Sequence, residues 1–223
     1  GANVSISGAV VTINPTANLA SSQGYYVQVD ATAIDDASGN SFAGISDTTT
    51  LSFTAADSAG PAIASSSPAD NATGVAVDAN IILTFDENVV VGSGNITLKK
   101  SSDNSTVQAM PVGGGNVSAS GAVVTINPSA NLDSSQGYYI QIAATAFDDA
   151  SGNSYAGIND TTSLNFTAAD VLGPTLSSSS PADNATGVAG GANIVLTFNE
   201  NVVLGSGNVS LYKTNGTLVE AMN

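Results

Sequence analysis

The residues best suited to chemistry are carboxylates and amides in a short, glycine-punctuated loop. Between residues 148 and 160, four side chains carry oxygen ligands: Asp148, Asp149, Asn153 and Asp160. Calcium takes about six to eight hard oxygen ligands on a loop that can bend. The loop therefore predicts a calcium site, although its spacing is not that of an EF-hand. The alternative is that Asp-x-x-Gly-Asn is simply a good turn.

The first part of the chain repeats this loop. At the same offsets it has Asp35, Asp36, Asn40 and Asp47. A further group of acids flanks two Gly-Pro dipeptides, with Asp57 and Asp170 just before them and Asp70 and Asp183 after them. A calcium ion there would fix the angle between neighbouring modules. The alternative for these junction acids is that they are solvated linker residues.

Catalysis is disfavoured by the residue types that the chain lacks. Because there is no histidine or cysteine, the common nucleophilic triads and histidine-centred acid–base sites are excluded. Paired carboxylates remain as a route to glycoside hydrolysis. The adjacent acidic pairs, such as Asp86 and Glu87, would point to opposite faces of a strand. We therefore predict no catalytic residues and no enzyme.

The charge of the chain argues against two kinds of binding partner, nucleic acids and anionic membranes. The 223 residues include 3 Lys+Arg against 18 Asp+Glu, for a net charge of −15. Nucleic acids and anionic membrane surfaces need basic side chains, so neither is expected to bind. No apolar run approaches the roughly 20 residues that span a bilayer, so no membrane insertion is expected.

The sequence repeats itself at an offset of 113 residues, the separation of Pro68 from Pro181, which we call the repeat offset. This offset carries Pro15 to Pro128 and Pro68 to Pro181, within two copies of SSSPADNATG. The chain opens in the second half of one repeat, contains one whole repeat and stops midway through another. The predicted division is 1–57 as a C-terminal half-module, 58–170 as a complete module and 171–223 as an N-terminal half-module. A repeat of this kind is typical of an array of modules.

The whole repeat predicts an all-β fold. Apolar residues alternate in short segments bounded by turn residues, as where Ile81, Leu83 and Phe85 share one face. About seven such segments, roughly ten residues apart, indicate an antiparallel β-sandwich. Helical periodicity is missing, and only the segment from Pro128 to Gly137 could hold one short helical turn. Tyr138 and its equivalent Tyr25 have the setting of a tyrosine corner, and the alternative is that each simply fills the core.

These motifs carry a family resemblance. The run SSSPADNATGVAVDANIILTFDENV, the later GSGNITL and DDASGN, and LNFTAAD before Gly-Pro resemble the bacterial Ig-like repeats of large surface proteins. The resemblance covers essentially the whole chain and is closest to modules of S-layer proteins and giant repetitive adhesins. It implies tandem Ig-like sandwiches, secretion to the cell surface, and calcium at loops and linkers. This chain departs from the usual layout because it starts and ends inside a module.

Two functions are consistent with this pattern. The first is a structural spacer or building block of an extracellular fibre, filament or giant adhesin, stiffened by calcium. The alternative is a calcium-dependent adhesin module that recognises carbohydrate or a protein partner. The partners expected are other copies of the same module, either in tandem or head-to-tail by strand complementation, because a half-module alone leaves an apolar face and open edges.

Overall fold

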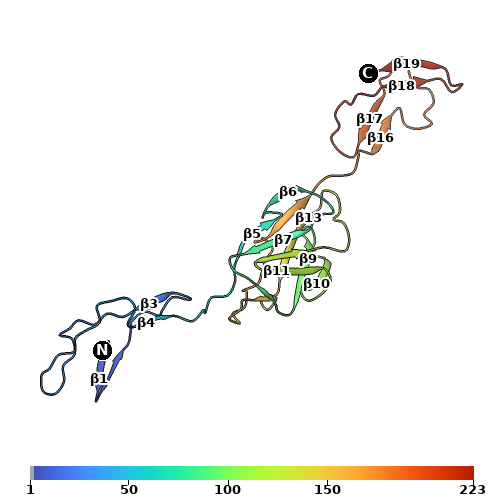
Figure 1. Cartoon of the computed structure of the whole chain (residues 1–223). Helices are drawn as coiled ribbons and strands as arrows, with labels where there is room; N and C mark the ends of the chain where they lie inside the picture. Colours follow the sequence, from blue (N-terminus) through green and yellow to red (C-terminus); the bar gives the residue numbers. More distant parts are fainter. Residues whose placement is uncertain (1–2) are drawn as a thin grey trace. The chain divides into compact units, whose positions relative to one another are not determined.

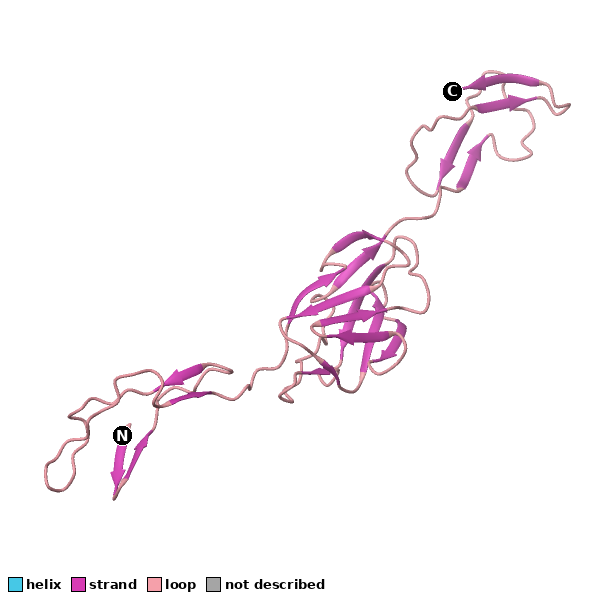
Figure 2. Ribbon diagram, viewed as in Figure 1, coloured by secondary structure: helices cyan, strands magenta, loops and turns pink. Residues whose placement is uncertain are grey.

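A computed structural model describes residues 3–223, so the first two residues of the predicted 1–57 half-module lie outside the described part. The chain divides into two compact units, Gly1–Asp170 and Val171–Asn223. Every regular element in the described part is a β-strand (Figure 2). The described residues contain no helix long and apolar enough to cross a membrane.

A sandwich of two main sheets forms the C-terminal part of the first unit (Figure 1). The larger sheet has the order β10-β9-β13-β15-β6. Its pairs are antiparallel except for β15 and β6, which run parallel. The strand bounds are β6 Ala72–Val75, β9 Asn95–Lys100, β10 Thr106–Pro111, β13 Gly137–Ile142 and β15 Asn165–Ala168.

The smaller sheet of the sandwich is antiparallel, with the order β11-β12-β7-β5. Its strands are β5 Ile63–Ser67, β7 Ile81–Phe85, β11 Val117–Ser120 and β12 Val123–Ile126. A short ribbon of β8 Val90–Val91 and β14 Phe147–Asp148 accompanies the two sheets. We call residues 58–170 the complete module.

The core of the complete module lies between the two sheets. Alternate residues of each strand point inward, and Leu83, Ile96, Leu98 and Ile140 are all fully buried. This is the period-two burial expected when one face of a strand is covered. Aromatic side chains fill one end of the core, where the rings of Phe147 and Tyr155 lie 5.4 and 5.3 Å from the ring of Phe85.

The predicted tyrosine corner is confirmed. The backbone N–H of Asp133 donates a 2.8 Å hydrogen bond to the hydroxyl of buried Tyr138. The N–H of Ala20 makes the same bond to Tyr25 at 2.7 Å. Burial raises the pKa of Tyr138, which keeps its hydroxyl neutral. The corner ties the loop before β13 to the sheet and so serves a structural role.

The chain enters and leaves the complete module at opposite poles. It enters where Ile63 of β5 pairs with Phe85 at the end of β7, an end we call the Phe85 pole. It leaves where Thr167 of β15 pairs with Gly137 at the start of β13, which we call the Gly137 pole. The far end of β13 returns to the Phe85 pole, because Ile142 bridges Ile158 in the loop that carries Tyr155.

Residues 3–57 contain two antiparallel strand pairs. One pairs β1 Val4–Ser7 with β2 Val10–Ile13, and the other pairs β3 Gly24–Tyr26 with β4 Ser52–Thr54. When moved by the repeat offset, their registers match those of β11 with β12 and of β13 with β15. Tyr25 and Phe53 stack at 5.9 Å, but Phe53 remains 43% exposed. We call β1–β4 the N-terminal strand set.

The second unit also contains two antiparallel strand pairs. They pair β16 Leu176–Ser180 with β17 Val195–Phe198, and β18 Val209–Tyr212 with β19 Leu218–Met222. These strands are equivalent to β5, β7, β9 and β10 of the complete module. Leu196 and Met222 remain 44% and 41% exposed, although Leu83 and Met110 at the equivalent positions are fully buried. We call β16–β19 the C-terminal strand set.

The structure refines two expectations. The complete module has nine strands in its main sheets rather than about seven, because β6 and other short strands form pairs that periodicity does not reveal. The segment between Pro128 and Gly137 has no helical turn in the described structure. Instead it follows the surface of the sandwich, with buried Leu132 donating its backbone N–H to the carbonyl of Val77 at 2.7 Å.

Candidate metal centre

Three carboxylates gather at the Phe85 pole of the complete module. Asp57, Glu87 and Asp149 each offer one oxygen within 4.8 Å of the others, and theirs is the one such group found among residues 3–223. They come from three separate segments: the connection that leads into the module, the loop after β7 and the loop after β14. Asp57 and Glu87 are half-buried, while Asp149 is only 2% exposed. We call this group the acidic triad.

The loop after β14 holds Asp149 rigidly. Its carboxylate accepts hydrogen bonds from the backbone N–H groups of Ser151 and Asn153 at 2.8 and 2.7 Å, and from the Asn153 side-chain amide at 2.7 Å. Burial acts to raise the pKa of Asp149, but these hydrogen bonds together outweigh it and hold the pKa below its usual value. Asp149 therefore stays ionised inside the triad.

The connection before the module lies directly on this loop. The Asn153 amide donates to the backbone carbonyl of Asp57 at 3.3 Å. A Cβ built on Gly60 would collide with the backbone carbonyl oxygen of Ser154, so only glycine permits this approach. The Asp57 side chain also accepts a 2.7 Å hydrogen bond from the Ser21 hydroxyl of the segment between β2 and β3. The triad thus joins the connection to two loops of the module.

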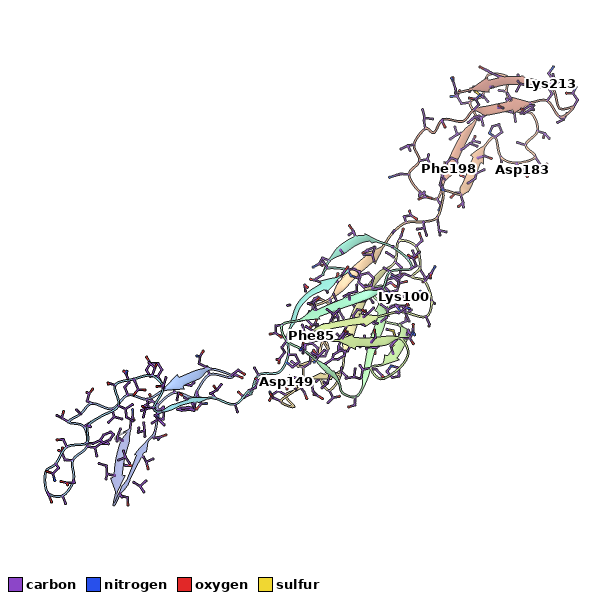
Figure 3. All side chains as sticks on the ribbon, in the orientation of Figure 1. Phe85, Lys100, Asp149, Asp183, Phe198 and Lys213 are labelled. Atoms are coloured by element: carbon purple, nitrogen blue, oxygen red, sulfur yellow. The ribbon has the colours of Figure 1, made fainter. Side chains whose placement is uncertain are left out.

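The triad carries unbalanced negative charge. Desolvation raises the pKa of Glu87, and the charges of Asp149, Asp57 and Asp86 add to this effect. The chain has only three basic residues, and all are engaged elsewhere or in the second unit. Lys100 pairs with Asp133 at 2.7 Å, and Lys99 lies 5.9 Å from the ring centre of Tyr139. Figure 3 shows Lys100 well apart from Asp149 on the module, so a cation at the triad would have to come from solution.

The structure brings only part of the predicted ligand set together. Asp57, Asp149 and Asn153 meet at the triad, whereas the other predicted residues of the loop have different partners. The Ser154 hydroxyl donates to Asp148. Asp160 accepts from the backbone N–H groups of Thr162 and Ser163, and closes a turn.

The predicted ligands outside the complete module's loops are likewise dispersed. Asp36 holds Asn40 as Asp149 holds Asn153, with side-chain and backbone bonds of 2.8 and 2.7 Å. Asp35 accepts from the Ser41 hydroxyl, and Asp47 closes a turn with Thr49 and Thr50. Asp170 accepts a 2.8 Å bond from Ser134. The junction acid Asp70 bonds to Asn165 at 2.9–3.0 Å rather than joining Asp57.

Sequence reasoning did not place Glu87 in this cluster. Glu87 was considered only together with its neighbour Asp86, as a pair of carboxylates poorly placed for catalysis. The signal that was available is topological, because the residue after a strand that ends at the Phe85 pole must lie near the loop after β14. The predicted loop site and the predicted junction site therefore share one cluster.

The turn at Asp160 gives a test of acid sensitivity. Hydrogen bonds from Ser163 and Thr162 lower the pKa of Asp160 from 3.8 to about 2. A carboxylate with a lowered native pKa stabilises the fold above its unfolded pKa, and this contribution is lost as the pH falls through the native pKa. We expect Asp160→Asn to remove part of the acid-induced loss of stability between about pH 4 and pH 2, measured by urea unfolding. Asp47→Asn, in the equivalent turn outside the complete module, should leave the pH dependence of that module's stability unchanged. The same pH dependence in wild type and Asp160→Asn would contradict a lowered pKa for Asp160.

Fold and site together define a class of protein: tandem all-β sandwich modules with carboxylates at a connection between them. The chain belongs to the bacterial Ig-like domain family, whose model matches residues 1–55, 57–168 and 170–221. No curated protein matches it.

Two solved structures are similar to parts of the chain. The S-layer protein rSbsC(31-844) matches at 14% identity with a TM-score of 0.32, over 73% of this chain and 19% of that one. The N-terminal part of the bacterial S-layer protein SbsC matches at 14% identity with a TM-score of 0.33, over 71% of this chain and 37% of that one. The chain therefore spans well under half the length of either.

Proposed function

We propose that this chain is a structural building block of an extracellular bacterial surface array, fibre or giant adhesin, and that calcium stiffens the connections between its modules. The tandem family matches over residues 1–55, 57–168 and 170–221 support an array. The connections are short, since only Ser58 and Ala59 separate Asp57 from the Gly60-Pro61 bend. Short connections that contact the next module suit a spacer better than a flexible tether.

The observation that carries the calcium proposal is the acidic triad at such a connection. Hard carboxylate oxygens from three segments match the ligand preference of calcium, with water and backbone carbonyls to complete the shell. Asp57 lies on the connection, whereas Glu87 and Asp149 lie on the module that follows. An ion held by all three would restrain the connection and relieve the repulsion that, after desolvation, raises the pKa of Glu87.

Thermal unfolding with and without calcium tests this proposal. We expect calcium to raise the midpoint of the chelator-treated protein, because a ligand that binds only the folded state stabilises it by about 2.7 kcal/mol at 100 times its Kd. Glu87→Gln should remove most of that shift. Without calcium the same substitution should be neutral or slightly stabilising, since it removes a carboxylate whose ionisation is disfavoured.

Glu200→Gln is the matched control, because Glu200 is equivalent to Glu87 in the C-terminal strand set. In dilute solution we expect this variant to keep the full calcium shift of the complete module. An unchanged midpoint for wild type in calcium, or an equal shift in Glu87→Gln, would contradict a structural calcium ion at the triad.

A further inference from the structure

A serine from the segment between β2 and β3 holds the connection that leads into the complete module. The Ser21 hydroxyl donates to Oδ1 of Asp57 at 2.7 Å, and its oxygen accepts the backbone N–H groups of Ser58 and Ala59 at 2.8 and 3.2 Å. The Ala59 N–H also lies 3.2 Å from Asp57 Oδ1. One hydroxyl therefore bonds to three consecutive residues of the connection, an arrangement that we call the serine clasp.

The fold of the N-terminal strand set fixes the position of Ser21. On one side, the N–H of Ala20 bonds to the Tyr25 hydroxyl at 2.7 Å in the tyrosine corner. On the other side, the pairing of β3 with β4 continues beyond the strands, since the Ala55 N–H donates to the carbonyl of Gln23 at 2.9 Å. The backbone at Ser21 therefore cannot move away from the connection without breaking these bonds.

The complete module holds the same connection from its other side. The Asn153 amide donates to the backbone carbonyl of Asp57 at 3.3 Å and to the carboxylate of Asp149 at 2.7 Å. One side chain thus links two members of the acidic triad. Among residues 3–223, no hydrogen bond engages Asp57 Oδ2, so the clasp leaves this oxygen for an ion.

The second connection carries the same clasp. There the Ser134 hydroxyl donates to Oδ1 of Asp170 at 2.8 Å, and both residues lie one repeat offset beyond their equivalents in the first clasp. The serine again follows the residue whose N–H bonds to the corner tyrosine, since Asp133 donates to Tyr138 at 2.8 Å. Corner and clasp therefore recur together, which favours a role at each connection.

We propose that Ser21 is a positioning residue for the acidic triad, and that its clasp on the connection directs the Asp57 carboxylate toward Glu87 and Asp149. Because the clasp already restrains this carboxylate, an ion that binds there has less conformational entropy to remove. The site then draws on two repeats, since Ser21 belongs to the repeat before the one that carries Glu87 and Asp149. The inference deepens the proposed calcium site, and only the calcium readout of its test rests on that proposal.

Calcium titration of the full chain by calorimetry tests this role. We expect Ser21→Ala to weaken calcium binding roughly three- to tenfold, the range that the net contribution of one hydrogen bond allows. Added to Asp57→Asn, the same substitution should cause no further loss, because Ser21 acts through Asp57. Ser134→Ala, the equivalent change at the second connection, is the matched control and should leave the affinity within about twofold of wild type.

Amide hydrogen exchange of Ser58 and Ala59 in the calcium-free protein, followed by NMR, is the second readout. Both N–H groups lose their Ser21 acceptor in Ser21→Ala, so we expect exchange roughly threefold faster or more. Equal calcium affinity in wild type and Ser21→Ala, or equal exchange at both amides, would overturn the positioning role. If wild type bound no calcium, the proposed calcium site would fail, whereas faster exchange in Ser21→Ala would still support the clasp.

Discussion

Replacing Phe166 with alanine is expected to lower the free energy of unfolding of the complete module by about 3–5 kcal/mol, the usual cost of removing a buried phenylalanine side chain. Phe166 is 2% exposed and lies in β15, between β13 and β6 of the larger sheet. Its ring lies 6.0 Å from that of Tyr138, so the substitution would also leave a cavity beside the tyrosine corner. Chemical denaturation of the full chain in dilute solution measures the loss.

The chain supplies its own control for this substitution. Phe53 is the equivalent residue of the N-terminal strand set, and it is 43% exposed. We expect Phe53→Ala to change the unfolding of the complete module by no more than about 0.5 kcal/mol. Similar losses from the two substitutions in dilute solution would contradict the conclusion that the core of the complete module is independent of the strand sets.

Gly157→Ala should destabilise the complete module by about 2–4 kcal/mol, through backbone strain combined with a steric conflict. Gly157 has a φ of +80°, and a Cβ there would lie 2.7 Å from the carbonyl oxygen of Ile142. The same carbonyl accepts the N–H of Ile158 at 2.9 Å, so relieving the conflict would disturb the bridge at the end of β13. Thermal or urea unfolding of the full chain measures the effect.

Gly152→Ala separates the two causes of this loss. Gly152 has a φ of +88°, but a Cβ there would meet nothing within 4 Å. Its substitution should cost only the strain of a left-handed backbone, about 1–2 kcal/mol. If Gly152→Ala costs as much as Gly157→Ala, the contact with Ile142 has no energetic role.

Much of the sandwich follows from local patterns that the sequence displays directly. The alternation of Ile81, Leu83 and Phe85 predicts the inward face of β7, and all three are buried. The spacing before Tyr138 predicts the hydrogen bond to its hydroxyl. These features depend on residues that are close in the chain, where period-two burial and turn chemistry act locally.

The features that the sequence did not predict depend on contacts between segments far apart in the chain. The parallel pairing of β6 with β15 joins residues far apart in sequence, and no periodicity marks it. Glu87 joins Asp57 and Asp149 only because three loops meet at one pole. Asp160, a predicted calcium ligand, also closes a turn, in which the backbone N–H and hydroxyl of Ser163 donate to its carboxylate. Asp-rich turns and calcium loops use the same residues, so only the fold distinguishes them.

Equivalent strands of the repeats differ in burial. Leu83 is fully buried in the complete module, whereas its equivalent Leu196 in the C-terminal strand set is 44% exposed. Exposed apolar faces of this kind mark interaction surfaces in soluble proteins.

The most direct test is calcium binding to the full chain after chelator treatment, measured by isothermal titration calorimetry. The account predicts that the wild-type chain binds calcium and that Glu87→Gln weakens this binding, because Glu87 offers one of three carboxylate oxygens that lie within 4.8 Å of one another. No binding by the wild-type chain, or equal binding by Glu87→Gln, would contradict it.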